Sequence, residues 1–214
     1  MAHYAGKTVL VTGASSGIGE AMVRNLAASP CTIFIGARSK DKLQSLKNEL
    51  ETNDVKIHVI PMDLADSKSL IEAFNELSRK TDRLDLLINN GGISQRGLAK
   101  DTEFSVVNKI MQVNFLGTIE WTTHCMPLLL KADKSHIVAI SSVVGEYGFP
   151  LRSAYAASKH ALKGYFQSMQ LEHDSPSVSI VSPGRITTNI SLNALTSDGR
   201  KHGEMDAGQA GGIS

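Results

Sequence analysis

An α/β protein with one doubly wound parallel sheet, covered by helices on both faces to give three layers, is predicted by two features of the sequence. Short apolar runs such as VLV, LLI and IVAI alternate with longer stretches of helical periodicity. Such runs are typical of strands covered on both faces, and their alternation with helices indicates successive βα units. A glycine-rich turn also joins the first run to the first helical stretch, as in sheets of the Rossmann type.

Each expected element follows from its own pattern. Six short runs rich in β-branched residues predict strands at Lys7–Thr12, Thr32–Gly36, Lys56–Pro61, Leu84–Asn89, His136–Ser141 and Val178–Ser182. Five longer stretches predict helices at Ile18–Ala28, Lys40–Leu50, Ser67–Arg79, Phe104–Met126 and Ser153–Glu172. In the first helix, Ile18, Met22 and Leu26 recur at the spacing of one buried stripe.

Length and composition point to one catalytic domain that spans residues 1–214. The chain has 214 residues, of which 42% are hydrophobic, and this is enough for one core. Residues 185–214 are expected to form a substrate lid followed by an irregular end. The last eighteen of these residues include five glycines and show no apolar periodicity.

The overall charge argues against nucleic acid or an anionic membrane as a partner. Lysine and arginine number 22 against 21 acidic residues, which gives a net charge of +1 and no strong field of either sign. No stretch approaches 18 apolar residues, and the first strand begins too early to leave room for a signal peptide. Cys31 and Cys125 lie outside any metal-binding spacing. We therefore expect a cytoplasmic protein without a membrane span or a bound metal.

The turn after the first strand has the residues of a phosphate-binding loop. Gly13 allows a tight turn, Gly17 lets the backbone approach a pyrophosphate, and Gly19 permits close packing of the helix on the sheet. The helix start offers unpaired N–H groups and a partial positive charge to phosphate. The expected contacts to a dinucleotide in this turn also include Ser15, Ser16 and Ile18. The alternative interpretation is an ordinary βα turn.

The spacing GxxxGxG of this turn resembles that of the short-chain dehydrogenases/reductases and differs from the GxGxxG of longer-chain dinucleotide dehydrogenases. The resemblance extends from Thr8 to about Thr188. The segments ISSVVG, SAYAASKHA and SPGRITTNIS are most similar to the member-seven type of dehydrogenase/reductase within that family. The resemblance implies the strand order 3-2-1-4-5-6, followed by a seventh strand that we expect to be missing from this chain.

Ala37 and Arg38, at the end of the second strand, favour NADP(H) over NAD(H). Ala37 stands where an acidic residue would bind the ribose 2′-hydroxyl, and the Arg38 guanidinium can bind a 2′-phosphate that a carboxylate would repel. Ser15 and Ser39 offer further hydroxyl groups to the same phosphate. The alternatives are NAD as the cofactor and an Arg38 side chain that points into solvent.

The resemblance assigns further cofactor contacts to three other loops. Asp63 and Leu64 match the position that binds adenine, although Asp63 also has the pattern of a helix N-cap. Asn90, Gly91 and Gly92 resemble the family's NNAG element, in which Gly91 replaces alanine. The family's PGxxxT element, which meets the nicotinamide carboxamide, corresponds to Pro183, Gly184, Ile186 and Thr188.

Four side chains form the expected catalytic set. Tyr155 and Lys159 lie four positions apart on one face of a helix, and Ser142 follows the run HIVAIS. Proton transfer at a carbonyl or alcohol oxygen needs a group that exchanges a proton near neutral pH, and an ammonium would lower the pKa of a nearby tyrosine. By resemblance, Tyr155 transfers the proton, and Lys159 lowers the Tyr155 pKa and holds the nicotinamide ribose. Ser142 would bind the substrate oxygen, and Asn114 would hold a water on the proton path.

The predicted function is hydride transfer between NADP(H) and a ketone, an aldehyde or a secondary alcohol. Substrate contacts are expected from Gln95, Tyr147 and Phe149 in addition to Ser142 and Tyr155, which gives a mostly apolar pocket. Ordinary loop packing explains Gln95, Tyr147 and Phe149 about as well.

Two other functions and an assembly are also considered. A dinucleotide-binding sensor or scaffold without turnover would result if the missing carboxyl-terminal strand left the pocket open. A nucleotide-dependent transferase would have no use for the serine, tyrosine and lysine set. A homodimer or homotetramer is expected, built on the two long helices Phe104–Met126 and Ser153–Glu172, because their apolar residues exceed one sheet-facing stripe.

Overall fold

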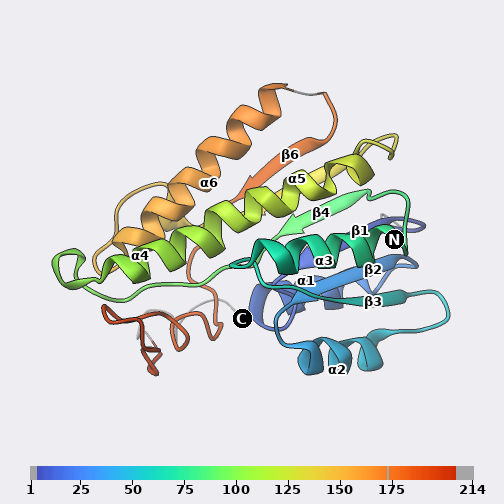
Figure 1. Cartoon of the computed structure of the whole chain (residues 1–214). Helices are drawn as coiled ribbons and strands as arrows, with labels where there is room; N and C mark the ends of the chain where they lie inside the picture. Colours follow the sequence, from blue (N-terminus) through green and yellow to red (C-terminus); the bar gives the residue numbers. More distant parts are fainter. Residues whose placement is uncertain (1–3, 173, 206–214) are drawn as a thin grey trace.

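The computed structural model describes residues 4–172 and 174–205, which form one parallel sheet of six strands (Figure 1). The strands are β1 (Thr8–Thr12), β2 (Thr32–Ala37), β3 (Lys56–Pro61), β4 (Leu86–Asn89), β5 (His136–Ile140) and β6 (Ser177–Val181). Their order across the sheet is β3-β2-β1-β4-β5-β6. The predicted doubly wound α/β fold and its strand order are therefore confirmed.

Helices alternate with the strands. They are α1 (Gly17–Leu26), α2 (Lys40–Leu50), α3 (Ser67–Ser78), α4 (Phe104–Met111), α5 (Gly117–Leu129) and α6 (Ser153–Glu172). A π-helical turn, η2 (Gln112–Leu116), joins α4 to α5, so the single helix predicted from Phe104 continues to Leu129 with a wider turn in its middle. Within residues 4–172 and 174–205, no helix is both long and apolar enough to cross a membrane.

The start of β4 differs from the prediction by two residues. The strand was expected from Leu84, but its pairing with β1 begins at Leu86, opposite Val9. The intervening Asp85 turns its carboxylate toward β1 and accepts a hydrogen bond from the N–H of Thr8 at 2.9 Å. This side-chain bond satisfies a backbone donor of β1 at the sheet end, so the regular ladder starts later.

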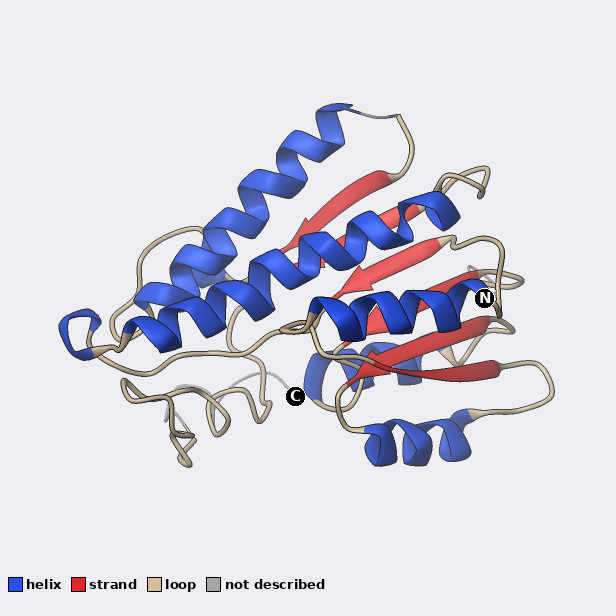
Figure 2. Ribbon diagram, viewed as in Figure 1, coloured by secondary structure: helices blue, strands red, loops and turns tan. Residues whose placement is uncertain are grey.

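Helices cover both faces of the sheet (Figure 2). Two clusters of buried apolar side chains hold them there. Leu10 of β1 and Phe34 of β2 pack with Trp121 of α5 and Phe166 of α6 on one face, which α3 also covers. The neighbouring Val9 belongs to a second apolar cluster, formed with α1 and α2 on the other face. Successive strand side chains point to opposite faces, so adjacent residues of one strand serve different layers.

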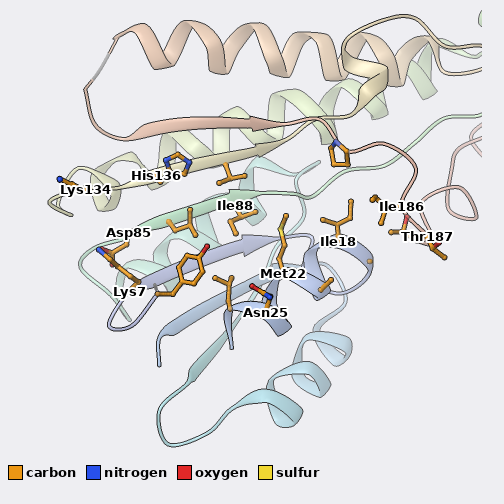
Figure 3. A pocket seen from close by; sticks show the side chains of 18 residues that line it. Lys7, Ile18, Met22, Asn25, Asp85, Ile88, Lys134, His136, Ile186 and Thr187 are labelled. Atoms are coloured by element: carbon orange, nitrogen blue, oxygen red, sulfur yellow. The ribbon is translucent and has the colours of Figure 1, made fainter. Parts of the chain in front are cut away.

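The sheet face beside α1 is hollowed. A groove of about 960 Å³ is lined there by Leu86, Ile88 and Val138 of the sheet and by Ile18 and Met22 of α1. Figure 3 shows the side chains of Ile18, Met22 and Ile88 along this groove. Of the helices that the structure describes, only α1 borders this groove. The described part of the sheet ends at β6, which pairs with β5 alone.

Candidate active site

The carboxyl ends of the strands border a second hollow, a cleft of about 600 Å³. Ligands of open α/β sheets bind at this edge. The loops after β1, β2, β3 and β4 contribute to its lining, and so does the segment after β6. The fold brings together most of the predicted cofactor contacts in this lining: Gly13, Ser15, Ser16, Gly17, Ile18, Arg38, Ser39, Asp63, Leu64, Asn90, Gly91, Gly92 and Thr188.

Three glycines shape the turn after β1 so that a ligand can approach the backbone. Gly13 and Gly17 have φ angles of +66° and +57°, in the left-handed region that glycine tolerates best. A Cβ on Gly19, behind the cleft lining, would lie 2.3 Å from the Gly13 carbonyl oxygen. Because α1 begins at Gly17, its unpaired N–H groups and partial positive charge lie at the cleft. This arrangement fits the pyrophosphate of a dinucleotide.

Thr12 and Asn90 join that turn to the loop after β4. The Thr12 hydroxyl accepts hydrogen bonds from the N–H groups of Asn90 and Gly91, both at 3.0 Å. The Asn90 side chain donates in return to the carbonyl oxygens of Thr12 at 3.0 Å and of Gly13 at 3.3 Å. Asn90 therefore holds two cleft-lining loops together, a role that the sequence did not indicate.

Packing against Leu64 explains why glycine, and not the alanine of the related motif, stands at position 91. A Cβ at this position would lie 2.6 Å from Cδ1 of the buried Leu64. The leucine therefore fills the space that a methyl group at position 91 would need. Leu64 and Gly91 both line the cleft. The glycine at position 91 is therefore compatible with an intact cleft lining.

Positively charged side chains line the cleft beyond the end of β2. Arg38 and Ser39 are both exposed in its lining. Lys42, from the first turn of α2, lines the cleft as well. Sequence reasoning missed Lys42, although its place four positions after Arg38 was a usable signal.

Asp63 lines the cleft but does not cap the helix that follows. Its carboxylate accepts from the N–H of Ala65 at 2.9 Å, and its own N–H donates to the Ser69 hydroxyl at 3.0 Å. The N-cap of α3 is Asp66, which accepts from the N–H of Lys68 at 3.0 Å. The N-cap alternative for Asp63 is therefore wrong, because Asp66 takes that position.

Tyr155 and Ser142 meet near the carboxyl end of β5. Tyr155 lies buried in the first turn of α6, and Ser142 directly follows Ser141 at the strand end, where its hydroxyl accepts from the N–H of Val144 at 3.2 Å. Burial raises the pKa of Tyr155, whereas its side-chain hydrogen bond with Ser142 and the charge of Arg152 lower it. The net direction is upward. The lower pKa expected from Lys159 is thus not found in the protein alone, because desolvation of the phenolate outweighs the favourable contacts.

Lys159 is buried one helical turn further along α6. Its ammonium donates to the carbonyl oxygen of Ile140 at 2.8 Å and lies 5.9 Å from the centre of the Tyr155 ring. Burial lowers the pKa of Lys159 to about 8 because it disfavours the charged form. A Cβ at Gly92 would lie 3.7 Å from this ammonium, so Lys159 faces the cleft lining.

Asn114 lies almost fully buried in the π-helical turn η2, a kind of irregularity that is frequent at functional sites. Its Oδ1 accepts from the N–H of Ile93 at 2.8 Å. Its Nδ2 donates to the carbonyl oxygen of Ile93 at 2.9 Å and to the Ser158 hydroxyl at 3.0 Å. Both amide hydrogens are thus used within the protein, and a water held here would donate to an oxygen of Asn114.

Gln95, predicted to contact substrate, has a structural role instead. The residue is fully buried. Its Oε1 accepts from the N–H of Ala154 at 2.8 Å, and its Nε2 donates to the Thr102 hydroxyl at 3.0 Å. The substrate prediction for Gln95 is corrected on this ground, because its amide joins the loop after β4 to the start of α6. Tyr147 and Phe149 are exposed on the loop between β5 and α6, and neither lines the cleft as the described residues form it.

The segment after β6 divides between the two hollows. Pro183, Ile186 and Thr188 line the groove beside α1, where Figure 3 labels Ile186. Thr188 lines the cleft as well. A Cβ on Gly17 would lie 3.1 Å from Thr188 Cγ2, so this threonine packs on the phosphate turn. Gly184 lines neither hollow in the described part of the chain.

The predicted lid adds residues to the cleft as far as it is described. Asn193, Leu195 and Lys201 line the cleft. The N–H of Leu195 donates to the carbonyl oxygen of Ser94 at 2.8 Å, and the carbonyl oxygen of Leu195 accepts from the N–H of Arg96 at 2.7 Å. Residues 206–214, part of the predicted irregular end, lie outside the described residues.

The fold and the cleft lining define an α/β protein of the dinucleotide-binding class. The family model described as short chain dehydrogenase matches residues 7–198. The chain therefore belongs to the short-chain dehydrogenase/reductase family of oxidoreductases.

Curated relatives agree with this assignment. A dehydrogenase/reductase SDR family protein 7-like of Anopheles gambiae is 40% identical over 223 residues, which cover 99% of this chain and 69% of the relative. A dehydrogenase/reductase SDR family member 7B of Xenopus tropicalis is 39% identical over 220 residues, covering 99% of this chain and 71% of the relative. The predicted likeness to the member-seven type is thereby confirmed.

Solved structures share the fold. A short chain dehydrogenase/reductase from Burkholderia phymatum in complex with NAD has a TM-score of 0.83 at 21% identity, over 89% of this chain and 70% of that one. An alcohol dehydrogenase from the archaeon Thermococcus sibiricus, complexed with 5-hydroxy-NADP, has a TM-score of 0.82 at 23% identity, over 90% and 86%. A short chain dehydrogenase from Shigella flexneri complexed with NADP has a TM-score of 0.78 at 28% identity, over 86% and 80%.

Proposed function

We propose that the protein transfers a hydride between NADP(H) and a ketone, an aldehyde or a secondary alcohol. The observation that carries this proposal is the meeting of Ser142, Tyr155 and Lys159 beside the dinucleotide cleft. Burial shifts the pKa of both Tyr155 and Lys159 away from their ordinary values. Perturbed groups that gather at a cleft are typical of catalytic sites.

The chain's residues would hold the cofactor at three points. The glycine turn and the start of α1 would receive the pyrophosphate, and Asp63, which lines the same cleft, would bind the adenine. Lys159 faces the part of the cleft lined by Gly92, where it would bind the nicotinamide ribose hydroxyls. Thr188 packs on Gly17 and would meet the carboxamide.

The proton at the substrate oxygen is moved by the protein. A bound nicotinamide supplies the hydride to the carbonyl carbon, or accepts it in the reverse direction. Ser142 orients the substrate oxygen toward Tyr155 by a hydrogen bond. In reduction the Tyr155 hydroxyl gives its proton to that oxygen, which yields the alcohol, and in oxidation the phenolate takes the proton back. The Lys159 ammonium stabilises the phenolate, and Asn114 holds a water that returns the proton.

NADP(H) is proposed as the cofactor because of the side chains that follow β2. Arg38 and Lys42 place two cations in the cleft lining, with the Ser39 hydroxyl between them in the sequence. A 2′-phosphate gains charge-assisted hydrogen bonds from such groups, and Ala37 presents no carboxylate to repel it. NAD remains the alternative cofactor.

The substrate is proposed to be apolar, because Tyr147 and Phe149 expose aromatic surface on the loop that follows Ser142. The active form is proposed to be a homodimer or homotetramer.

Turnover of a panel of apolar ketones, aromatic aldehydes and secondary alcohols tests the function. We expect Tyr155→Phe to abolish turnover and to leave the Kd for NADPH nearly unchanged, because the hydroxyl serves proton transfer and not dinucleotide binding. Tyr165→Phe, which removes a hydroxyl from the same helix, is the matched control and should keep both values. Turnover by Tyr155→Phe at the parent rate would contradict the mechanism. Tight NADPH binding without turnover of any panel member would favour a sensor or scaffold.

A further inference from the structure

An arginine stands at the start of α6, where helix formation by itself does not favour one. The carbonyl oxygen of Arg152 accepts the first helical hydrogen bond, from the N–H of Ala156 at 2.7 Å, and only 9% of the residue is exposed. Helix starts favour short polar caps and negative charge, and they disfavour a cation. The preceding Leu151 has a φ of +64°, a left-handed conformation that leucine rarely adopts. Tertiary contacts must therefore account for both residues.

Arg152 bonds the loop that follows β4. Its Nη1 donates to the Ser94 hydroxyl at 2.7 Å and to the carbonyl oxygen of Gln95. A further bond, from the N–H of Ala154 to Gln95 Oε1 at 2.8 Å, joins the same two segments, and here the loop contributes the side chain. The side chain of Arg152 and the side chain of Gln95 thus both form hydrogen bonds between the helix start and the loop.

The left-handed turn and the lid extend this connection. The turn at Leu151 presents its carbonyl oxygen to the N–H of Gly97 at 3.1 Å. On its other side the loop forms backbone hydrogen bonds with Leu195 of the predicted lid. The Leu195 N–H donates to the carbonyl oxygen of Ser94, and the Leu195 carbonyl oxygen accepts from the N–H of Arg96. The loop from residue 94 to residue 97 therefore lies between the helix start and the lid, and it contacts both.

Arg152 also acts on the proposed proton-transferring group three positions along the chain. Its positive charge lowers the pKa of Tyr155, in opposition to burial. The other groups that face this side chain are Ser142, from the end of β5, and Lys159, one turn further along α6. Arg152 is thus the charged residue that belongs both to the loop contact and to the surroundings of the phenol.

We propose that Arg152 is a positioning residue for the reaction. By bonding Ser94 and Gln95, it fixes the start of α6 and Tyr155 against the loop that follows the cofactor site, and through this loop against the lid. The inference rests on the proposed function of Tyr155. It implies that lid position and phenol position are coupled.

Titration of the Tyr155 phenol tests the inference without any substrate. The near-ultraviolet absorbance difference between each protein and its Tyr155→Phe counterpart isolates this phenol from the three other tyrosines. In Arg152→Gln we expect Tyr155 to titrate at a pH higher by about half a unit or more, because a positive charge is lost. Arg152→Lys keeps the charge, so its Tyr155 should titrate as in the parent.

Arg79→Gln is the control for loss of an arginine elsewhere. It removes an exposed arginine at the end of α3 and should leave the Tyr155 titration unchanged. An unchanged titration in a folded Arg152→Gln protein would overturn the inference.

Hydrogen exchange tests the contact itself and covers the case in which Arg152→Gln does not fold. Ser94→Ala removes one acceptor of Arg152 and keeps its charge. We expect the N–H groups of Gly97 and Leu195 to exchange about tenfold faster in Ser94→Ala and in Arg152→Lys, which loses the planar fork. Parent-like exchange in both variants would overturn the inference.

Turnover separates this inference from the proposed function. With a panel substrate that the parent reduces, both Ser94→Ala and Arg152→Lys should lower kcat by about tenfold. Arg152→Lys changes a residue outside the cleft lining and should leave the Kd for NADPH unchanged. A parent that reduces nothing in the panel contradicts the proposed function, yet the titration and the exchange still decide the role of Arg152. Parent-like kcat in both variants contradicts the role of Arg152 alone.

Discussion

Lys159 carries its ammonium where water is excluded, and this one side chain links the stability of the fold to pH. Its pKa is about 8 in the folded chain and 10.5 in the ordinary case. Between these values the unfolded chain keeps a proton that the folded chain has lost, so the free energy of unfolding rises with pH. Below about pH 8 both states are protonated, and burial of the charge then lowers stability by its full amount.

We expect Lys159→Met to lose this rise. Between about pH 8 and pH 10.5, the difference in unfolding free energy between parent and variant should change by at most about 1.4 kcal/mol per pH unit. Denaturant unfolding at several pH values measures it. Burial raises the pKa of Cys31, Cys125 and Tyr155, and these groups act with the opposite sign in both proteins. The comparison cancels the two cysteines. The centre of the Tyr155 ring lies 5.9 Å from the Lys159 ammonium, so Tyr155 would not cancel. Both proteins therefore carry Tyr155→Phe, and equal slopes would then mean that Lys159 stays protonated.

Arg38 is the residue on which the cofactor choice is expected to depend. A charge-assisted hydrogen bond to a 2′-phosphate contributes about 1.5–3 kcal/mol, which is on the order of tenfold to over a hundredfold in affinity. The double variant Ala37→Asp, Arg38→Gln should therefore prefer NAD(H), because the carboxylate accepts from the 2′-hydroxyl and repels the phosphate. Arg38→Gln alone should weaken the preference for NADP(H) without reversing it, because Lys42 still lines the cleft.

Titration of both cofactors at fixed ionic strength measures this preference, since salt screens the contact. Equal affinity of the parent for NADP and NAD would contradict the assignment. It would mean that the exposed Arg38 side chain points away from the ribose.

At the scale of elements, Gly117 fixes how closely α5 approaches the loop after β3. A Cβ on Gly117 would lie 1.8 Å from the carbonyl oxygen of Leu64, a residue of the cleft lining. Gly117→Ala should therefore displace either the helix or the loop, with a loss of about 1–3 kcal/mol in unfolding free energy and weaker dinucleotide binding.

Gly164 in α6 provides the matched control for this substitution. It is exposed, and nothing lies within 4 Å of a Cβ built on it. Gly164→Ala should raise the unfolding free energy by about 0.5–1 kcal/mol, because alanine favours the helix. Thermal or denaturant unfolding of the two variants checks both signs, and a Gly117→Ala protein as stable as the parent would contradict the packing argument.

At the scale of the whole molecule, α4, α5 and α6 lie on one face of the sheet (Figure 1). Some of their apolar side chains are exposed. Phe104 at the start of α4 is 74% exposed, and Leu171 near the end of α6 is 89% exposed. We expect a dimer or tetramer that buries such residues in its interface. Sedimentation at micromolar concentration should show it, and Phe104→Glu with Leu171→Glu should shift the protein toward the monomer. A parent that sediments as a monomer would contradict this expectation.

Local patterns in the sequence were enough to predict the sheet and the two parts of the site that lie within short segments. The glycine turn is one continuous segment at the start of α1. Tyr155 and Lys159 lie on one helix face because four positions make about one turn. Strand boundaries were right to within one or two residues, and β4 starts later because the Asp85 side chain bonds Thr8, 77 positions away.

Only the tertiary structure decided which side chains serve the ligand and which hold the loops. Asn90 bonds the Thr12 backbone across 78 positions of sequence, and Arg152 reaches Ser94 across 58. Gln95, predicted to face substrate, is buried by the same set of contacts. Residues of equal polarity in adjacent loops are indistinguishable by pattern. What separates them is whether a buried donor or acceptor from a distant segment lies within hydrogen-bond distance, and this depends on packing that the folded chain alone provides.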